Sequence, residues 1–351
     1  MVAFILSYKM KKLLLGLIVL LLFVSCQPDR TSGLAGQPSQ SPPAPSAQTK
    51  TESTINAILF SWDGTSRDRI KEGLERKELP NLQQIINEGS LWDIDLYKGH
   101  NTATKPGHTV MLTGYGPDVT GVFSNAKFQP IPEGYTIFER LQVHFGKDNI
   151  TVGMVTGKTH HVGGAAPYSG VPTTGKHKAK KKPAKTEKPR EIPGEPFYLT
   201  KSHLNFFDSN AADADVVGPK MLNYIEKYKD QRFFFFFHFS DPDSKGHKFG
   251  DKSPERRQAI IKCDEWTGKV MQKLKDLNLY QKTVIYVTAD HGFDDGEKTH
   301  KNAPYVFLST NNKKVTHGGN AWDTPATILK RFGVDIEKIT PPLGGKPLYE
   351  K

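Results

Sequence analysis

Residues 231–240, QRFFFFFHFS, contain five consecutive phenylalanines and constrain the fold more than any other segment. Successive side chains of a β-strand point to opposite faces of its sheet, so this run places large aromatic groups on both faces. Such a strand is stable where helices cover both faces, as in a parallel sheet. The segment therefore predicts a buried central strand in an α/β domain.

Residues 55–351 alternate short apolar runs with segments of helical periodicity. Further strands are predicted at residues 55–62, 150–157, 283–290 and 303–310. Helices are predicted at residues 67–77, 79–89, 136–146, 221–229, 254–278 and 323–333. This alternation predicts one catalytic domain with a doubly wound α/β fold, in which a mostly parallel central sheet carries helices on both faces.

The first 26 residues are typical of a targeting segment. Lys11 and Lys12 precede the apolar run LLLGLIVLLLFVS, which is too short for a comfortable membrane span and ends at Cys26. The pattern resembles a bacterial lipoprotein signal, in which Cys26 becomes the lipidated first residue; a plain signal anchor is the alternative. Residues 27–54 are rich in Pro, Ser and Gln and predict a flexible tether. We therefore expect an exported bacterial lipoprotein, anchored to the membrane through Cys26, in the periplasm or outer membrane or at the cell surface.

The formal net charge of +11 is concentrated in two appendages. Residues 1–26 contain three lysines and no acidic residue, and residues 173–197 contain seven lysines and one arginine against three glutamates. The second stretch has no apolar period and no interleaved aromatic residues, which indicates a disordered, solvated insertion. The charge therefore does not predict a protein that binds nucleic acid.

Carboxylates and imidazoles follow three predicted strands where those strands end. In open α/β sheets, ligands bind beyond the carboxyl ends of the strands, so these side chains are expected to meet. The chain has only two cysteines, and Asp and His together suit zinc or another divalent first-row ion. Six such ligands could hold two ions, an arrangement that serves in-line displacement at phosphorus. The candidates are Asp63, Asp243, His247, Asp290, His291 and a third histidine, His300 or His317.

Thr104 is the candidate nucleophile. It lies two residues before Pro106, at the predicted start of a helix. A helix N-terminus offers unpaired N–H groups and a positive dipole end, and both favour a phosphate. Coordination to zinc can activate the Thr hydroxyl. The alternative is a simple N-cap, a common role for Thr before a helix. The metal-type residues elsewhere in the chain favour the nucleophile.

The order of these motifs resembles the alkaline phosphatase superfamily, and most closely its branch of nucleotide pyrophosphatase/phosphodiesterases and Thr-nucleophile phosphatases. The motifs are Asp63, Thr104-Lys-Pro-Gly-His108, Asp243-x-x-x-His247 and Asp290-His291-Gly292. The resemblance implies one zinc ion held by Asp243, His247 and a third histidine. It implies a second zinc ion held by Asp63, Asp290, His291 and the Thr104 oxygen.

The same resemblance implies two substrate contacts. Asn125 stands where the family has an Asn that contacts a phosphoryl oxygen, and Lys158 resembles a Lys that some phosphomonoesterases use to hold phosphate charge. For the third ligand we prefer His300, which precedes a predicted strand as in alkaline phosphatase itself. His317 lies in a His-Gly turn like that of the nucleotide pyrophosphatases and is the alternative.

These features predict a metal-dependent hydrolase of small phosphoric esters, either a phosphodiesterase/nucleotide pyrophosphatase or a phosphomonoesterase, acting through a phospho-threonine intermediate. A sulfatase of the same fold needs a Cys or Ser that is converted to formylglycine, and Thr104 cannot be converted. A phosphonate hydrolase is a further alternative, and export argues against a phosphoglycerate-mutase-like isomerase. A non-catalytic lipoprotein that binds metal or a polyanion is the alternative from another class. The sequence does not predict the preference between monoesters and diesters.

Overall fold

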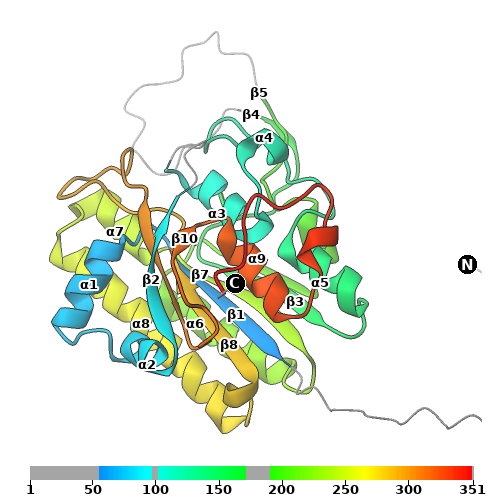
Figure 1. Cartoon of the computed structure of the whole chain (residues 1–351). Coiled ribbons are helices and arrows are strands. Elements are labelled where there is room, and N and C mark those ends of the chain that lie inside the picture. The colour runs from blue at the N-terminus through cyan, green and yellow to red at the C-terminus, as the bar shows by residue number, and fades with distance from the viewer. Residues whose placement is uncertain (1–54, 97–101, 171–189, 350–351) are drawn as a thin grey trace, which may run out of the picture. The chain divides into compact units, whose positions relative to one another are not determined.

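The structure, a computed structural model, describes residues 55–96, 102–170 and 190–349 (Figure 1). The predicted signal segment, the tether with Cys26 before it, and most of the Lys-rich insertion lie outside the described residues. Within the described residues, no helix combines the length and the apolar character that crossing a lipid bilayer requires.

One mixed sheet organises the described part of the chain, with strand order β10-β2-β9-β8-β1-β7-β3-β6. All neighbouring strands are parallel except where β9 pairs with β2 and with β8. A separate antiparallel pair, β4 and β5, flanks the insertion. The strands are β1 (Asn56–Trp62), β2 (Ser90–Asp95), β3 (Thr151–Thr156), β4 (Tyr168–Gly170), β5 (Arg190–Ile192), β6 (Phe206–Ser209), β7 (Phe233–Phe239), β8 (Thr283–Thr288), β9 (Tyr305–Thr310) and β10 (Gly319–Asn320).

Helices pack on both faces of this sheet, which confirms the predicted fold class (Figure 1). One layer contains α1 (Arg67–Glu75), α2 (Pro80–Glu88), α6 (Ala214–Lys227), α7 (Asp241–Phe249) and α8 (Pro254–Asp276). The other contains α3 (Thr104–Thr113), α5 (Ile137–Phe145) and α9 (Asp323–Arg331), with the short α4 (Pro117–Thr120) beside α3. The 3-10 turns are η1 (Thr200–His203), η2 (Tyr280–Lys282) and η3 (Ile336–Lys338).

The phenylalanine run forms β7, whose seven residues are all buried. Strand β7 pairs in parallel with β1 on one side and with β3 on the other. Its even-numbered residues face the α3/α5/α9 layer, where Phe234 contacts Phe138 of α5 at a centroid distance of 5.3 Å. Its odd-numbered residues face the opposite layer, where the Phe235 ring centroid lies 6.3 Å from that of Tyr228, directly after α6. The prediction of a strand buried on both faces is confirmed.

The sheet differs from the sequence-based expectation in three strands that were not predicted, β2, β6 and β10, and in the direction of β9. Strand β2 has one buried residue in six, so its apolar pattern is too weak to predict a strand from the sequence. Strand β9 runs antiparallel to β8, although strand-helix alternation predicts parallel neighbours. The reason is that residues 289–304 form a loop without a helix, whereas a connection between parallel strands usually crosses the sheet through a helix.

Candidate active site

Three buried aspartates meet at the carboxyl edge of the sheet, because β8, β1 and β7 are adjacent and parallel. Asp63 directly follows β1, Asp243 lies in the first turn of α7 after β7, and Asp290 lies just beyond β8. Each has one buried carboxylate oxygen without a hydrogen-bond partner among the described residues: Asp63 Oδ1, Asp243 Oδ1 and Asp290 Oδ2. Buried anionic oxygens of this kind are stable only beside a cation.

Three imidazoles present the same nitrogen to this space. In His247 and His291, Nδ1 lies 2.9 Å from a backbone carbonyl oxygen, and Nδ1 of His300 also contacts a backbone carbonyl. When Nδ1–H donates to a carbonyl, Nε2 of the neutral ring keeps a free lone pair, which is the usual state of a metal-binding histidine. Burial lowers the pKa of His300 to about 4, so this ring is neutral at pH 7.

The unpartnered oxygens gather around these nitrogens. His291 Nε2 lies 3.7 Å from Asp63 Oδ1, 3.4 Å from Asp290 Oδ2 and 4.0 Å from Asp243 Oδ1. His247 Nε2 lies 3.3 Å from Asp243 Oδ1. The donor atoms of Asp63, Asp290 and His291 lie within 4.8 Å of one another, as do those of Asp243, His291 and His300. Carboxylate oxygens and imidazole nitrogens in two adjacent groups fit a pair of divalent ions.

Lys158 is the cation that the structure places among these carboxylates. Its Nζ lies 2.7 Å from Asp63 Oδ2, 2.7 Å from Asp243 Oδ2 and 3.5 Å from Thr104 Oγ1. Burial alone would lower the pKa of Lys158, but Asp243, Asp63 and Asp290 together raise it, so the side chain stays charged. The expected phosphate-binding lysine therefore also neutralises the expected metal ligands.

Thr104 is the first residue of α3 and is buried, whereas Ala103 holds the N-cap position. Its hydroxyl faces the cluster, with Oγ1 3.4 Å from His291 Nε2. Asn125 lies next to this helix start, where its Oδ1 accepts a 2.9 Å hydrogen bond from the Lys105 amide. The structure thus brings both predicted phosphate contacts, Asn125 and Lys158, to the end of the helix that carries the hydroxyl.

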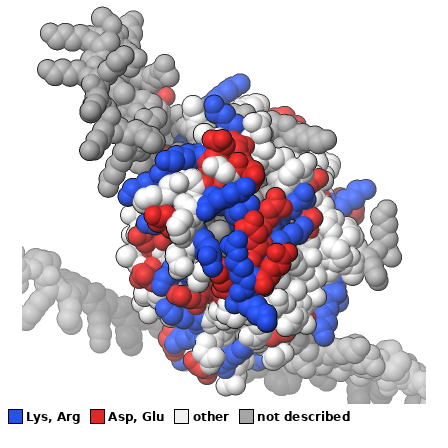
Figure 2. Space-filling view, turned by 90° about the vertical axis from the view of Figure 1, so that its left-hand side faces the viewer, with Lys and Arg blue, Asp and Glu red and all other residues white. Residues whose placement is uncertain are grey.

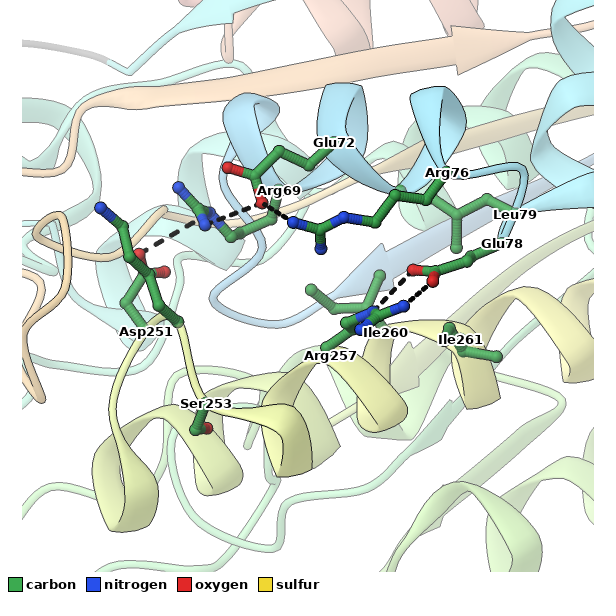
Figure 3. Close-up of a pocket in the computed structure, with 12 residues that line it drawn as sticks. Arg69, Glu72, Arg76, Glu78, Leu79, Asp251, Ser253, Arg257, Ile260 and Ile261 are labelled. Carbon is green, nitrogen blue, oxygen red and sulfur yellow. Dashed lines mark hydrogen bonds and ion pairs between the residues drawn. The ribbon is translucent and has the colours of Figure 1, made fainter.

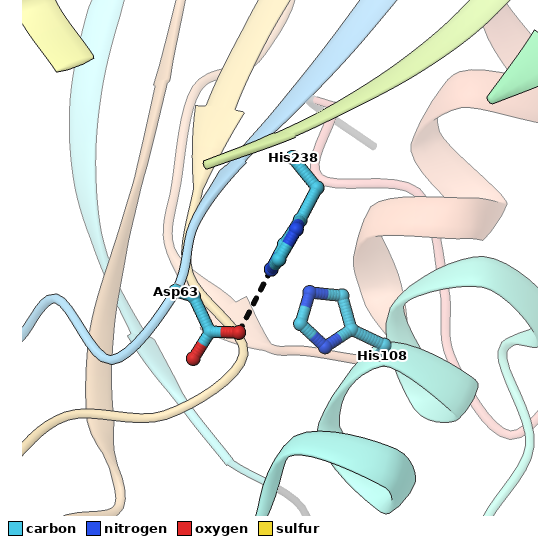
Figure 4. Close-up of side chains that lie close together, drawn as sticks. All are labelled: Asp63, His108 and His238. Atoms are coloured by element: carbon cyan, nitrogen blue, oxygen red, sulfur yellow. Dashed lines mark hydrogen bonds and ion pairs between the residues drawn. The ribbon is translucent and has the colours of Figure 1, made fainter. Parts of the chain in front are cut away.

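His238 and His108 are buried in the same region, although their sequence context predicts a role for neither (Figure 4). The Gly157 amide donates to His238 Nδ1 at 3.1 Å. The proton of this ring therefore resides on Nε2, which donates to Asp63 Oδ2 at 2.8 Å. His238 consequently orients Asp63 and offers no free lone pair to an ion.

His108 connects α3, the helix that begins at Thr104, to Asp290. Its Nδ1 lies 2.9 Å from the Thr104 carbonyl oxygen and 3.2 Å from Asp290 Oδ2, and its Nε2 lies 2.9 Å from Ser61 Oγ. The spacing of four residues places His108 one turn after Thr104 on the same helix face. In the sequence, this four-residue spacing marks His108 as a neighbour of Thr104. The interruption of the phenylalanine run marks His238.

With this geometry established, comparison with protein-family models matches residues 57–331 to type I phosphodiesterase / nucleotide pyrophosphatase. All the candidate ligands and Thr104 lie inside the matched range. The chain belongs to this family. The resemblance to the alkaline phosphatase superfamily is thereby confirmed, and the chain is a member of a family of phosphoric-ester hydrolases.

Curated relatives of this family member are distant. It is 22% identical over 246 residues to a bis(5′-adenosyl)-triphosphatase of Xenopus laevis, an alignment that covers 68% of this chain and 47% of the relative. It is 24% identical over 306 residues to ectonucleotide pyrophosphatase/phosphodiesterase family member 1 of Mus musculus, which covers 78% of this chain and 28% of the relative. The chain thus spans about half or less of the length of these relatives.

Solved structures share the fold. Murine ectonucleotide pyrophosphatase/phosphodiesterase 5, in an inactive form in complex with AMP, superposes with a TM-score of 0.55 at 12% identity, covering 83% of this chain and 97% of that one. A protein in complex with its substrate D-glucosamine-2-N,6-O-disulfate also superposes with a TM-score of 0.55, at 16% identity, covering 84% and 79%. At these identities the likeness establishes the fold.

The two candidates for the third histidine lie in different places in this family member. His300 Nε2 is 3.2 Å from His247 Nε2, and its ring stacks against that of His291 at a centroid distance of 4.0 Å. His317 precedes β10 near the edge of the sheet, where its Nδ1 lies 2.8 Å from the Gly318 carbonyl oxygen. The geometry brings His300, and not His317, to the carboxylates.

A surface cavity of about 270 Å³ lies apart from this cluster, between α1 and the start of α8 (Figure 3). Arginine and glutamate side chains pair across its lining: Arg69 Nη1 lies 2.9 Å from Glu72 Oε2, and Arg257 Nε lies 2.8 Å from Glu78 Oε2. On the side of the molecule that carries α1, basic and acidic side chains are likewise intermixed (Figure 2). The cavity therefore offers no concentrated positive charge to a phosphate ester.

Proposed function

We propose that this family member hydrolyses phosphodiesters or nucleotide pyrophosphates through a covalent phospho-threonine on Thr104. The observation that carries the proposal is the Thr104 hydroxyl, 3.4 Å from His291 Nε2, beside three aspartates with unpartnered buried oxygens. The family supports phosphoric-ester chemistry, and the relatives named for bis-adenosyl triphosphate and for nucleotide pyrophosphate support a substrate with two substituents on the attacked phosphate.

The site chemistry requires two divalent ions, and we propose zinc. The residues that would hold them are Asp63, Asp290, His291 and Thr104 for one ion, and Asp243, His247 and His300 for the other. When bound, the ions would stabilise the negative charge that builds on the attacking and leaving oxygens.

The side chains of the chain perform the remaining tasks. Asn125 and Lys158 hold phosphoryl oxygens at the N-terminus of α3, where the helix dipole also favours negative charge. Thr104 Oγ1 forms a bond to phosphorus while the bond from phosphorus to the leaving oxygen breaks. The Thr104 hydroxyl proton passes to water, and the leaving group departs as an oxyanion that takes a proton from water. Water then attacks the phospho-threonine, which restores Thr104 and yields the phosphate monoester.

Kinetic comparison of bis-nitrophenyl phosphate with nitrophenyl phosphate, with zinc supplied, tests the substrate class. We expect the diester to be the better substrate, and a clear preference for the monoester would contradict the assignment. Thr104→Ala should lower turnover by more than about 10³-fold, because removal of a nucleophile leaves only binding and electrostatics. Full activity in this variant would exclude the covalent mechanism.

Two controls accompany Thr104→Ala. Thr104→Ser keeps a hydroxyl and should retain measurable activity. Thr109→Ala removes a hydroxyl of the same helix that donates to the Lys105 carbonyl at 2.7 Å, and it should leave turnover near the wild-type value. Mass spectrometry of enzyme that is acid-quenched during turnover of bis-nitrophenyl phosphate should find a nitrophenyl-phosphoryl group on the peptide that contains Thr104.

We also propose that the protein is exported and held to a membrane by a lipid on Cys26. The basic residues, the apolar run and the position of Cys26 support this proposal. Cys26→Ala should move the protein from the membrane fraction to the soluble fraction of the producing cells. If the variant stays in the membrane fraction, residues 1–26 act as a plain signal anchor instead.

A further inference from the structure

Gly64 forms the turn that connects Asp63 to the rest of the site. Its φ of +71° lies in the left-handed region, and an added Cβ would approach Phe293 and Asp243 to 2.9–3.1 Å. The Gly64 amide donates a 3.0 Å hydrogen bond to Asp290 Oδ1. The Gly64 turn therefore sets the direction of Asp63 and, through its amide, holds Asp290; both are expected metal ligands.

The carbonyl oxygen of Gly64 is held by Arg256 of α8, which is fully buried. The Arg256 Nη2 donates to this carbonyl, while Nη1 donates to Asp251 Oδ1 at 2.5 Å and to the Asp251 carbonyl at 3.1 Å. The guanidinium also lies over the Phe293 ring, 4.6 Å from its centroid. One planar group thus joins the loop before α8 to the turn after β1.

Asp251 is itself fixed from several sides. It is 3% exposed, its amide donates to the Glu297 carbonyl at 2.8 Å, and its Oδ2 accepts from the Gly296 amide at 3.3 Å. Arg69 Nε, on the wall of the surface cavity, lies 3.7 Å from the same oxygen. A buried ion pair of this kind contributes little net stability compared with an apolar pair of equal volume. We therefore expect the Arg256–Asp251 ion pair to act mainly by fixing the geometry of the groups that it contacts.

We propose that Arg256 and Asp251 form a positioning pair that sets the directions of Asp63 and Asp290 through the Gly64 turn. Arg256 and Asp251 form no hydrogen bond with Asp63 or Asp290, and they act on them through the Gly64 backbone. The inference rests on the proposed two-metal function. Residues that orient metal ligands in this way typically change metal affinity by about 10- to 100-fold when they are lost.

Zinc affinity, measured by competition with a chromophoric chelator at 25 °C, tests the proposal. Arg256→Lys keeps the charge but loses the planar fork that bonds two acceptors at once, so we expect affinity to fall by about 10- to 100-fold. Asp251→Asn should also lower zinc affinity. Arg257→Lys is the matched control, since this neighbour on α8 is half-exposed and pairs with Glu78. It should bind zinc like the wild type.

A second measurement separates positioning from general destabilisation. Val270→Ala, in the buried face of the same helix, should lower Tm without changing zinc affinity. In metal-free protein, amide hydrogen exchange in the peptide that contains Gly64 should accelerate in Arg256→Lys and not in Val270→Ala.

Two outcomes overturn different conclusions. If the wild type binds zinc and Arg256→Lys binds it equally well, the positioning role is wrong. If the wild type binds no divalent ion, the proposed two-metal function fails, and the hydrogen-exchange comparison still decides whether Arg256 holds the Gly64 turn.

Discussion

Replacement of Lys158 by Met should destabilise the metal-free protein far more than the metal-loaded one. The Lys158 ammonium is the positive charge 2.7 Å from both Asp63 and Asp243, and its side chain is only 16% exposed. Loss of one partner from a buried charge cluster destabilises a protein by about 3–5 kcal/mol, because the remaining charges stay buried without compensation. For a domain of this size, that corresponds to a fall in Tm of about 6–10 °C.

Bound zinc should remove most of this difference. Ions at the same carboxylates supply the positive charge that the variant lacks, so the Tm of Lys158→Met and the wild type should converge when zinc saturates the site. The assay is a thermal melt after dialysis against a chelator, repeated with excess zinc. Lys201→Met is the matched control, since Lys201 Nζ donates to the Gly164 carbonyl at 2.7 Å, and its Tm deficit should not depend on zinc.

Either of two results would refute this reasoning. A metal-free Lys158→Met protein with the wild-type Tm would mean that the ammonium does not compensate the aspartates. A Tm deficit of equal size with and without zinc would mean that Lys158 stabilises the fold by packing alone.

Two further predictions concern the third histidine and the packing of α2. His300→Ala should lower zinc affinity by about 100-fold or more, whereas His317→Ala should leave it within about twofold, as measured by titration calorimetry; the reverse order would reassign the ligand. Asp264 of α8 accepts hydrogen bonds of 3.1 and 2.7 Å from the amides of Asn81 and Leu82 at the start of α2. Asp264→Ala should therefore lower the free energy of unfolding by about 2–3 kcal/mol in urea denaturation, and a loss no larger than that of the exposed control Asp276→Ala would contradict the capping role.

The fold was largely predictable because its strongest signals are local. A run of phenylalanines at residues 233–237 can be stable only in a doubly covered strand, and the strand-helix alternation around it orders the remaining elements. Strand β2 could not be predicted, because its stability comes from pairing with β9 rather than from its own apolar residues. The direction of β9 also depended on its connection from β8, which contains no helix at residues 289–304.

The site was predictable where chemistry follows directly from strand ends. Asp63, Asp243 and Asp290 each follow a strand that the sequence identifies, and their convergence follows from parallel pairing. The sequence marks His108 and His238 by their positions, but the partners of the supporting residues were not predictable, because these hydrogen bonds join distant positions. His238 and Asp63 are separated by 175 residues, and Arg256 and Gly64 by 192.

The phenylalanine run alone does not determine how β7 aligns with its neighbours β1 and β3, and His238 supplies the missing information. Shifting β7 by two residues along β1 and β3 would keep every ring on its own face, so hydrophobicity alone barely distinguishes the correct alignment from its neighbours. Strand β7 contains a single polar side chain, that of His238, and only the observed pairing of Ser61 with His238 brings this imidazole level with the end of β1. The ring that is hydrogen-bonded to Asp63 thus also distinguishes the observed alignment of an otherwise repetitive strand.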